Sequence, residues 1–293
     1  MRDSRRFYAR HDLGQNFIRD PRICAALAEA AGIESGDLVL EVGCGQGDLT
    51  AALLNRSARV VGCETDPRLI PMLEERFEAE LATGEFTLLV GDAQLHDFRQ
   101  FVALARQQGR HFRVAANLPY YLTREFLIKF FTEVPEATSM SFMLQKEAVE
   151  RLIAPAWDEP GYVAKRYGPM ALLARNYGRA EIAYRPRRQD FQPAPHVDSL
   201  FVRLERCEDC PEASRMLELW NFYCLAFNQR RKTLLQNLKS RYSIAELRMT
   251  FETLSFKAQV RAEELSPQDF ATLIACLERS DDDRSDGCDI LQS

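Results

Sequence analysis

Four consecutive residues, Asn117, Leu118, Pro119 and Tyr120, have types and an order that suit chemistry on a nucleobase. The Asn117 side-chain oxygen and the Leu118 carbonyl are two acceptors that can hold both hydrogens of one amino group, and the proline keeps the turn in place. Tyr120 offers an aromatic face on which an unstacked base can lie. Taken alone, the four residues also fit an ordinary turn after a buried strand, with Tyr120 in the core.

An exocyclic amino group such as that of adenine is a poor nucleophile, because its lone pair is delocalised into the ring. An enzyme must hold the nitrogen so that this lone pair points at a methyl donor, and two acceptors on its hydrogens do so. A general base is not required, since the methylated ammonium product is acidic enough to lose its proton to water. We therefore predict that residues 117–120 are the catalytic residues of a methyl transfer to adenine.

A glycine-rich loop, Gly43-Cys44-Gly45-Gln46-Gly47, follows the first predicted strand and precedes a predicted helix. Its glycines allow the backbone to turn tightly and to approach a ligand closely. The dinucleotide pattern GxGxxG would require glycine at position 48, where this chain has Asp48. The spacing GxGxG therefore favours a ligand that has no pyrophosphate to cradle.

Two acidic residues follow the next two predicted strands. Glu64 comes 21 residues after Gly43, where a carboxylate can accept hydrogen bonds from ribose hydroxyls. Asp92 is placed to bind the amino group of an adenine. Either acid alone is more readily a solvated loop residue, but together, at the ends of strands two and three, they favour an adenosine-containing ligand.

In these motifs the sequence resembles the ribosomal RNA adenine dimethyltransferases, a family that includes small-subunit enzymes and the macrolide-resistance enzymes of the large subunit. The resemblance extends from about residue 13 to residue 277. It covers three further stretches, which are Leu13-Gly14-Gln15-Asn16-Phe17-Ile18, Phe142-Met143-Leu144-Gln145-Lys146-Glu147, and Phe191, Pro193, Pro195, Val197, Asp198 and Ser199. Two positions depart from the family's usual pattern, with Tyr121 in place of Asn and Pro169 in place of Arg.

The resemblance implies that S-adenosylmethionine is the cofactor. It also implies which residues contact this cofactor, namely Asn16, Ile18, Gly43, Glu64, Asp92 and Asn117. Among them, Gly43 would lie under the methionine portion, Glu64 would hold the ribose and Asp92 the adenine. For the flipped base, the resemblance implies that Phe191 is a second aromatic wall beside Tyr120.

The resemblance also bears on the RNA that is methylated. Leu118, residues 142–147 and residues 227–234 favour the small-subunit branch. The expected reaction is then dimethylation of two adjacent adenosines in the 3′-terminal hairpin loop of small-subunit rRNA, within the 30S particle or its precursor. Arg230, Arg231 and Lys232 are predicted to lie on a helix and to bind phosphates on either side of the loop.

Three other functions remain open from the sequence. One is a large-subunit rRNA adenine methyltransferase of the macrolide-resistance type, and another is a ribosome-assembly factor with dispensable catalysis. The third is a nicotinamide-dependent oxidoreductase that shares the same sheet. This last function gives no account of residues 117–120, and Asp48 interrupts its fingerprint.

The elements that position these residues are predicted from hydrophobic periodicity. Strands are expected over residues 38–42, 59–63, 86–90, 113–116, 140–144, 180–184 and 200–204, and helices over 21–31, 49–55, 67–77, 124–132, 214–238, 244–254 and 267–278. The predicted fold class is α/β, a Rossmann-like S-adenosylmethionine-dependent methyltransferase sheet of about seven strands with a small all-helical C-terminal domain. The expected domains are residues 1–206, residues 207–279, and an acidic disordered tail over residues 280–293.

The composition is that of an ordinary globular protein, with 293 residues and 46% hydrophobic content. The net charge of −5 is concentrated in residues 278–289, which hold six acids and two arginines, so the rest of the chain is nearly neutral and can present basic clusters to RNA. No stretch reaches the length of a membrane span, and Cys207 and Cys210 have no second pair with which to hold zinc. We expect a cytoplasmic monomer without a metal.

Overall fold

The computed structural model describes the backbone of residues 16–288 and the side chains of residues 16–279. These residues form two compact units, of which the first contains residues 16–149 and 176–216 and the second residues 150–175 and 217–288. The first three residues of the predicted motif at 13–18 lie outside the described residues. Among the described residues, no helix combines the length and the apolar character that spanning a membrane requires.

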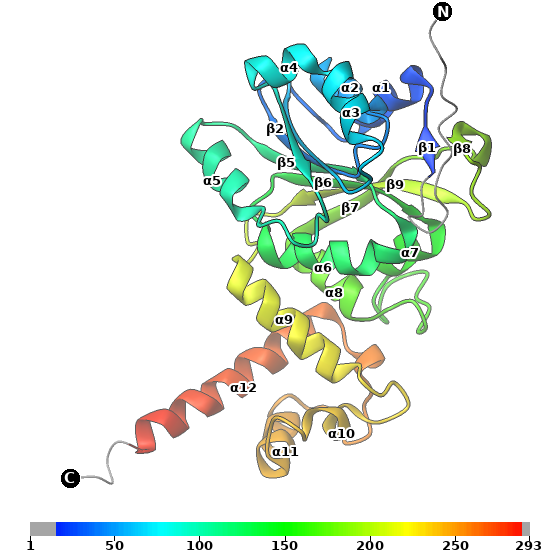
Figure 1. Ribbon diagram of the computed structural model, residues 1–293. Coiled ribbons are helices and arrows are strands. Elements are labelled where there is room, and N and C mark those ends of the chain that lie inside the picture. The colour runs from blue at the N-terminus through cyan, green and yellow to red at the C-terminus, as the bar shows by residue number, and fades with distance from the viewer. Residues whose placement is uncertain (1–15, 289–293) are drawn as a thin grey trace, which may run out of the picture. The chain divides into compact units, whose positions relative to one another are not determined.

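A seven-stranded sheet forms the centre of the first unit, in the order β4-β3-β2-β5-β6-β9-β7 (Figure 1). Its strands are β2 (Leu38–Val42), β3 (Arg59–Glu64), β4 (Phe86–Val90), β5 (Phe112–Asn117), β6 (Ser139–Gln145), β7 (Gly178–Tyr184) and β9 (Ser199–Arg206). Strands β2 to β6 run parallel, whereas β9 runs antiparallel to β6 and β7. All seven predicted strands are confirmed, with ends shifted by at most two residues.

Helices cover both faces of this sheet (Figure 1). On one face lie α1 (Pro21–Ala30), α2 (Asp48–Leu54), α3 (Ile70–Arg76) and α4 (Glu78–Thr83), and on the other lie α5 (Arg99–Gln107) and α6 (Thr123–Glu133). Every residue of β2 is buried, as expected of a parallel strand between two helical layers. On the α6 side, the ring of Phe130 stacks on those of Phe98 and Phe142, with centroids 6.1 and 5.3 Å apart.

The chain before α1 is tied to a segment near the end of the first unit. Strand β1 (Phe17–Ile18) pairs antiparallel with β8 (Phe191–Gln192), so Ile18 lies opposite Phe191. The side chain of Asp20 then accepts the N–H of Arg22 at 2.9 Å and caps α1. The β1–β8 pair was not predicted, because strands of two residues carry no periodicity.

The second unit is built from helices around an aromatic core. It contains most of α9 (Ala213–Ala226), then α10 (Leu234–Leu238), α11 (Ile244–Thr253) and α12 (Pro267–Cys288). An earlier segment of the chain also belongs to it, entering through α7 (Lys146–Leu152) and leaving through α8 (Pro169–Tyr177). The buried ring of Tyr167 packs edge-on against Phe227 at 6.0 Å, and its hydroxyl donates to the Leu265 carbonyl at 3.0 Å. Tyr167 therefore belongs to the core of this unit, whereas Pro169, the departure from the family pattern, is half-buried at the start of α8.

Three sequence expectations differ from the structure. The expected helical domain began at residue 207, whereas residues 150–175 also pack into the helical unit, which a boundary drawn along the chain cannot represent. The expected tail began at residue 280, but α12 continues to Cys288, because an established helix gains one hydrogen bond for each residue added. The predicted helix over 214–238 is two helices separated by a turn.

That turn has two identifiable causes. The side-chain amide of Asn237 donates to the Ala226 carbonyl at 2.7 Å, in place of a continuing helical N–H. Thr233 caps the new helix, with its hydroxyl accepting the N–H of Gln236 at 3.3 Å. Residues 230–232 therefore lie in a turn and not on a helix.

Candidate active site

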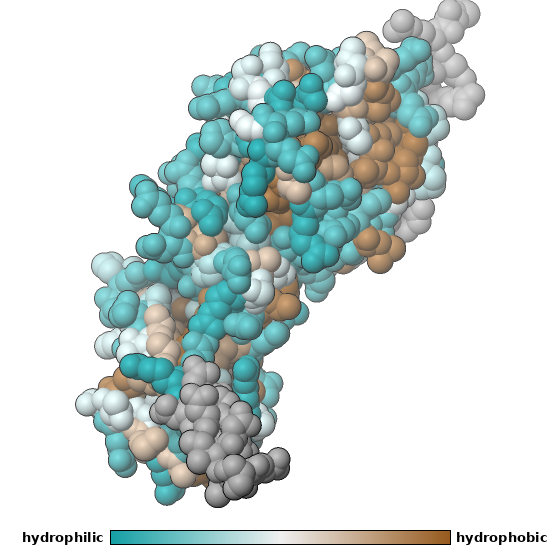
Figure 2. Space-filling model, turned by 90° about the vertical axis from the view of Figure 1, so that its left-hand side faces the viewer, coloured by the Kyte–Doolittle hydropathy of each residue, from teal (hydrophilic) through white to brown (hydrophobic). Residues whose placement is uncertain are grey.

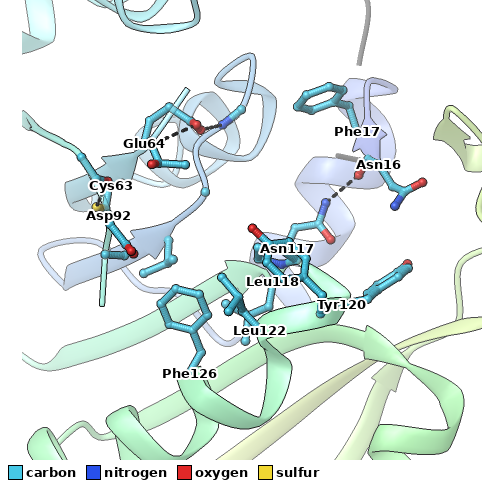
Figure 3. A pocket seen from close by; sticks show the side chains of 18 residues that line it. Asn16, Phe17, Cys63, Glu64, Asp92, Asn117, Leu118, Tyr120, Leu122 and Phe126 are labelled. Atoms are coloured by element: carbon cyan, nitrogen blue, oxygen red, sulfur yellow. Dashed lines mark hydrogen bonds between the residues drawn. The ribbon is translucent and has the colours of Figure 1, made fainter. Parts of the chain in front are cut away.

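A pocket opens at the carboxyl ends of β2, β3, β4 and β5, the edge at which open parallel sheets bind their ligands (Figure 3). Its space of about 770 Å³ includes open solvent at its mouth. Most of the predicted site residues line it, namely Asn16, Gly43, Glu64, Asp92, Asn117, Leu118, Pro119 and Tyr120. The order of strands in the sheet therefore brings together motifs that are spread over a hundred residues of sequence.

The glycine loop after β2 turns in left-handed backbone conformations. Gly43 and Gly45 have φ angles of 79° and 59°, a region that side chains disfavour. A Cβ at Gly45 would lie 2.8 Å from the ring of Phe17, so the absence of a side chain also lets the segment before α1 close over the loop. The loop ends at Asp48, the first residue of α2, whose carboxylate binds Arg76 at 2.9 Å.

Glu64 ends β3 with a side chain that is 5% exposed. Its Oε2 accepts the N–H of Gly45 at 2.7 Å, and its Oε1 accepts the N–H groups of Thr65 and Asp66 at 2.9 and 2.8 Å. Burial raises the pKa of Glu64, and the three N–H donors oppose part of that rise. Because a carboxylate has about four lone-pair positions, one position remains for a ligand hydroxyl. Glu64 thus anchors the glycine loop and also faces the pocket.

Glu41 lies on β2, two residues before the loop, and is 1% exposed. Its Oε2 accepts the hydroxyl of Thr50 at 2.6 Å. Burial raises the pKa of Glu41 to about 8, and the charge of Glu64 adds to the rise. Glu41 therefore keeps its proton at neutral pH. This protonation could not be predicted from the sequence, because burial of a strand acid depends on the helix packed over it.

Asp92 lies in the loop after β4 and is exposed to solvent. Its Oδ1 accepts the N–H of Gln94 at 2.9 Å, which forms a tight turn and fixes the side chain. In Figure 3 Asp92 lies on the same side of the pocket as Glu64. The two acids that the sequence assigned to one adenosine are therefore neighbours.

Asn117 ends β5 and lies near the centre of the pocket (Figure 3). Its Nδ2 donates to the main-chain carbonyl of Asn16 at 2.9 Å, which fixes the plane of the amide. Oδ1 is then the acceptor that the predicted chemistry needs. Leu118 is buried, and Pro119 turns the chain with φ −59° and ψ 129° into a 3-10 helix.

Tyr120 begins this short helix and lines the pocket. In Figure 3 it lies to one side of Asn117, while Glu64 and Asp92 lie to the other. Its hydroxyl shares a hydrogen bond of 2.5 Å with the hydroxyl of Ser199. Burial raises the pKa of Tyr120, so the phenol stays protonated at neutral pH. The acidic side chains and the aromatic ring of the described pocket therefore lie on opposite sides of Asn117.

Two predicted residues lie away from this pocket. Phe191 is 4% exposed and belongs to the apolar core beside β1, so its predicted contact with the base remains a prediction. Ile18 is 7% exposed and lines a smaller adjoining cavity together with Gly43 and Gly45. Its predicted contact with the cofactor likewise remains a prediction.

Sequence reasoning missed several residues that shape the site. Phe17 and Phe126 line the pocket, and Ser199 holds Tyr120. Phe17 and Ser199 stood in the resembling motifs, but nothing in the sequence showed what they would touch. Phe126 has the helical spacing of a core residue and lacks any polar signal.

The predicted RNA-binding cations differ from one another in the structure. Arg230 stacks over the ring of Phe227 at 5.6 Å and donates to the carbonyls of Tyr167, at 3.0 Å, and Ala164. It therefore joins the 227–232 turn to the segment before α8. Arg231 and Lys232 are exposed. Of the three cations that were predicted to bind RNA, Arg230 is held in place by hydrogen bonds to main-chain carbonyls.

The sequence matches the family of ribosomal RNA adenine dimethylases over residues 6–279. A relative named ribosomal RNA small subunit methyltransferase A, from Clostridium botulinum (strain Langeland), is 34% identical over 268 residues, which are 91% of this chain and 93% of that one. The protein of the same name from Shouchella clausii is 33% identical over 273 residues, which are 91% and 89% of the two chains.

Solved structures show the same fold. A dimethyladenosine transferase from Plasmodium falciparum has a TM-score of 0.71 at 24% identity, over 90% of this chain and 98% of that one. The 23S rRNA methyltransferase ErmE has a TM-score of 0.61 at 21% identity, over 90% and 100% of the two chains. The predicted fold class, a methyltransferase sheet followed by helices, is confirmed.

Proposed function

This chain belongs to the ribosomal RNA adenine dimethylase family, and from that premise we propose that it methylates adenine amino groups of small-subunit rRNA with S-adenosylmethionine as the donor. The observation that carries the proposal is the placement of Asn117 between two acidic side chains and an aromatic ring in one pocket. The relatives named small-subunit methyltransferases, which match along nine tenths of the chain, support the choice of RNA.

The residues present fit S-adenosylmethionine. Glu64 has one lone-pair position for a ribose hydroxyl, and a Cβ at Gly43 would come no closer than 3.7 Å to another atom, so the backbone there is open to a ligand. Asp92 supplies a carboxylate for the adenine amino group on the same side of the pocket. When bound, S-adenosylmethionine supplies an activated methyl group.

The chain's own groups orient the target amine. Asn117 Oδ1 and the Leu118 carbonyl accept its two hydrogens, so that the nitrogen lone pair points towards the side of the pocket that holds Glu64 and Asp92. The hydrogen bond from Asn117 to Asn16 keeps the acceptor still, which lowers the cost of reorganisation during the reaction. Tyr120 provides the stacking face, and the proton of the product leaves to water.

A hairpin loop is the form of RNA that this surface suits. Figure 2 shows hydrophobic residues gathered on part of the sheet-bearing unit within a mostly hydrophilic surface. Tyr121, which lines the pocket, is 56% exposed, and Val90 and Leu95, which lie within two residues of pocket residues in sequence, are 57% and 85% exposed. Unpaired bases can be splayed out at low cost and lie on such apolar or aromatic groups, whereas a duplex hides them. We propose two adjacent adenosines of the 3′-terminal loop as the target.

The decisive experiment offers the purified full chain, with radiolabelled S-adenosylmethionine, either small subunits from a strain that lacks this methylation or free large-subunit RNA. We expect label only on the small subunits, and mass spectrometry should find two adjacent dimethyladenosines near the 3′ end. Label confined to large-subunit RNA would transfer the chain to the resistance branch. Failure to bind S-adenosylmethionine in calorimetry, with or without RNA, would favour the assembly-factor function.

We further propose that one copy of the chain acts alone, in the cytoplasm where ribosomal subunits are assembled. Every lining residue of the described pocket comes from the first unit of a single chain. A second copy is therefore not needed to complete the site.

A further inference from the structure

Tyr120 and Ser199 come from segments 79 residues apart, yet their hydroxyl groups share a hydrogen bond of 2.5 Å. Tyr120 belongs to the turn that carries the proposed catalytic groups. Ser199 is the first residue of β9, is 3% exposed, and is not among the residues that line the described pocket. The bond therefore connects the reactive turn to a buried strand outside the pocket.

Ser199 has a position fixed by the sheet. It lies opposite Gln145 in the pairing of β9 with β6, and β9 is an inner strand between β6 and β7. One step further, the N–H of Lys146 donates to the Asp198 carbonyl at 2.9 Å and extends this pairing to the start of α7. The Ser199 hydroxyl is thus a fixed point at the edge of the sheet that carries the site.

The Tyr120 ring, by contrast, is not fixed by its own backbone. The 3-10 helix at residues 120–122 is one turn long, with the N–H of Leu122 donating to the Pro119 carbonyl at 3.1 Å. Two rotatable bonds separate the Tyr120 ring from this turn. A hydrogen bond at the far end of the ring restrains both of them, because the hydroxyl has to stay within bonding distance of Ser199.

We propose that Ser199 is a positioning residue for methyl transfer, because its hydroxyl holds the Tyr120 ring in the orientation on which the target adenine stacks. The inference rests on the proposed function for its substrate, but the hydrogen bond and the orientation of the ring do not depend on it. Stacking is sensitive to the direction of the ring, so a ring that samples other rotamers presents its face for only part of the time.

The kinetic test uses the full chain under single-turnover conditions with saturating S-adenosylmethionine and small subunits. We expect Ser199→Ala and Tyr120→Phe each to lower the rate constant about three- to tenfold, as for the loss of one net hydrogen bond, with S-adenosylmethionine affinity unchanged. The double variant should be no slower than the slower single variant, and Ser199→Thr should restore most of the rate. Tyr120→Ala, which removes the stacking face, should be slower than all of these.

Ser141 supplies the matched control. It lies on the neighbouring strand β6, is fully buried, and its hydroxyl has no hydrogen-bond partner among the described residues. Ser141→Ala should therefore keep the parental rate. Additive losses in the Ser199→Ala, Tyr120→Phe double variant, or a parental rate for Ser199→Ala, would overturn the proposal.

A second measurement tests the role of Ser199 even if the parent protein methylates no RNA. In that case the proposed function has failed, but the effect of Ser199 on the Tyr120 ring can still be measured. Protein containing 3-fluorotyrosine gives one ¹⁹F resonance for each tyrosine, and the resonance lost in Tyr120→Phe identifies Tyr120. We expect Ser199→Ala to shift or broaden that resonance and Ser141→Ala to leave it in place. An unchanged resonance in Ser199→Ala would show that Ser199 does not set the orientation of the ring.

Discussion

The side-chain Nδ2 of Asn117 donates a hydrogen bond to the main-chain carbonyl of Asn16, and its Oδ1 is the acceptor proposed for the target amine. We expect Asn117→Ala to lower the single-turnover rate by the equivalent of about 2.7 to 4 kcal/mol in the barrier, as for the loss of one preorganised polar group. S-adenosylmethionine affinity in calorimetry should stay within a few fold. Asn55→Ala, at the exposed end of α2, is the control. A rate within threefold of the parent would show that Asn117 does not orient the amine.

Glu64 accepts three main-chain N–H groups, so Glu64→Gln places an amide NH₂ against at least one of them. We expect S-adenosylmethionine binding to weaken by about 1 to 3 kcal/mol, since a buried donor loses its acceptor and the glycine loop loses its anchor. The melting temperature should fall as well. Glu75→Gln, an exposed residue of α3, should change neither quantity. Equal affinities of parent and Glu64→Gln in calorimetry would assign the ribose to another residue.

Glu41 makes the stability of the fold depend on pH. Its folded pKa of about 8 lies above the ordinary value of 4.5, so the folded state holds a proton that the unfolded state has released between these two values. The free energy of unfolding should therefore fall as pH rises through this window, by up to about 1.4 kcal/mol per pH unit. Glu41→Gln cannot lose a proton and should lack this slope. Parallel denaturation curves for parent and variant between pH 5 and pH 8 would contradict the assignment.

At the scale of elements, we propose that the 227–232 turn combines a structural cation, Arg230, with two cations that bind RNA, Arg231 and Lys232. We expect Arg231→Ala together with Lys232→Ala to weaken small-subunit rRNA binding and to reduce its log–log salt dependence by about one to two, without lowering the melting temperature. Arg230→Ala should lower the melting temperature, because two main-chain carbonyls lose their donor. Filter binding at several salt concentrations measures the first effect and calorimetry the second.

Arg106 provides the control for this prediction. It is an exposed cation on α5 that precedes the amino end of β5, the edge of the sheet opposite the pocket, so Arg106→Ala should leave the salt dependence unchanged. If Arg106→Ala and the double variant reduced the salt dependence equally, the turn would have no special part in RNA binding.

The elements also show what a sequence can and cannot specify. Buried parallel strands such as β2 and β5 were predictable, since a short and largely apolar run between turn signals has few other uses in a globular protein. The ends of helices were harder to predict from the sequence. The break between α9 and α10 depends on Asn237 reaching back to Ala226, a contact over 11 residues that no periodicity reveals. Four site residues were found because each lies at the end of a predicted strand or just after one, namely Gly43, Glu64, Asp92 and Asn117. The hydrogen bond between Tyr120 and Ser199, by contrast, spans 79 residues of sequence.

At the scale of the whole molecule, two separate segments of the chain, residues 150–175 and residues 217–288, form the helical unit. A fragment that ends at Met216 keeps residues 150–175 but loses the helices they pack on. We expect this fragment to bind an apolar dye and to melt at a lower temperature, since the buried side chains of Tyr167 and Leu172 lose partners worth about 1.5 to 3 kcal/mol for each fully buried apolar side chain. A matched fragment with Gly and Ser in place of residues 154–172 should bind less dye. Equal dye binding by the two fragments would show that this segment does not depend on the helical unit.

The division of the helical unit between two chain segments also has a consequence during synthesis. Tyr167 emerges from the ribosome 98 residues before Leu265, the residue whose carbonyl its hydroxyl binds. At roughly 5 to 20 residues per second, translation leaves that side chain waiting on the order of 5 to 20 seconds for its partner. Over that interval the nascent chain exposes an aromatic segment after the fifth parallel strand of the sheet, β6, has been made. A protein whose family acts on ribosomal RNA is thus itself sensitive to the speed of the ribosome, and its yield should depend on how quickly residues 168–265 are translated.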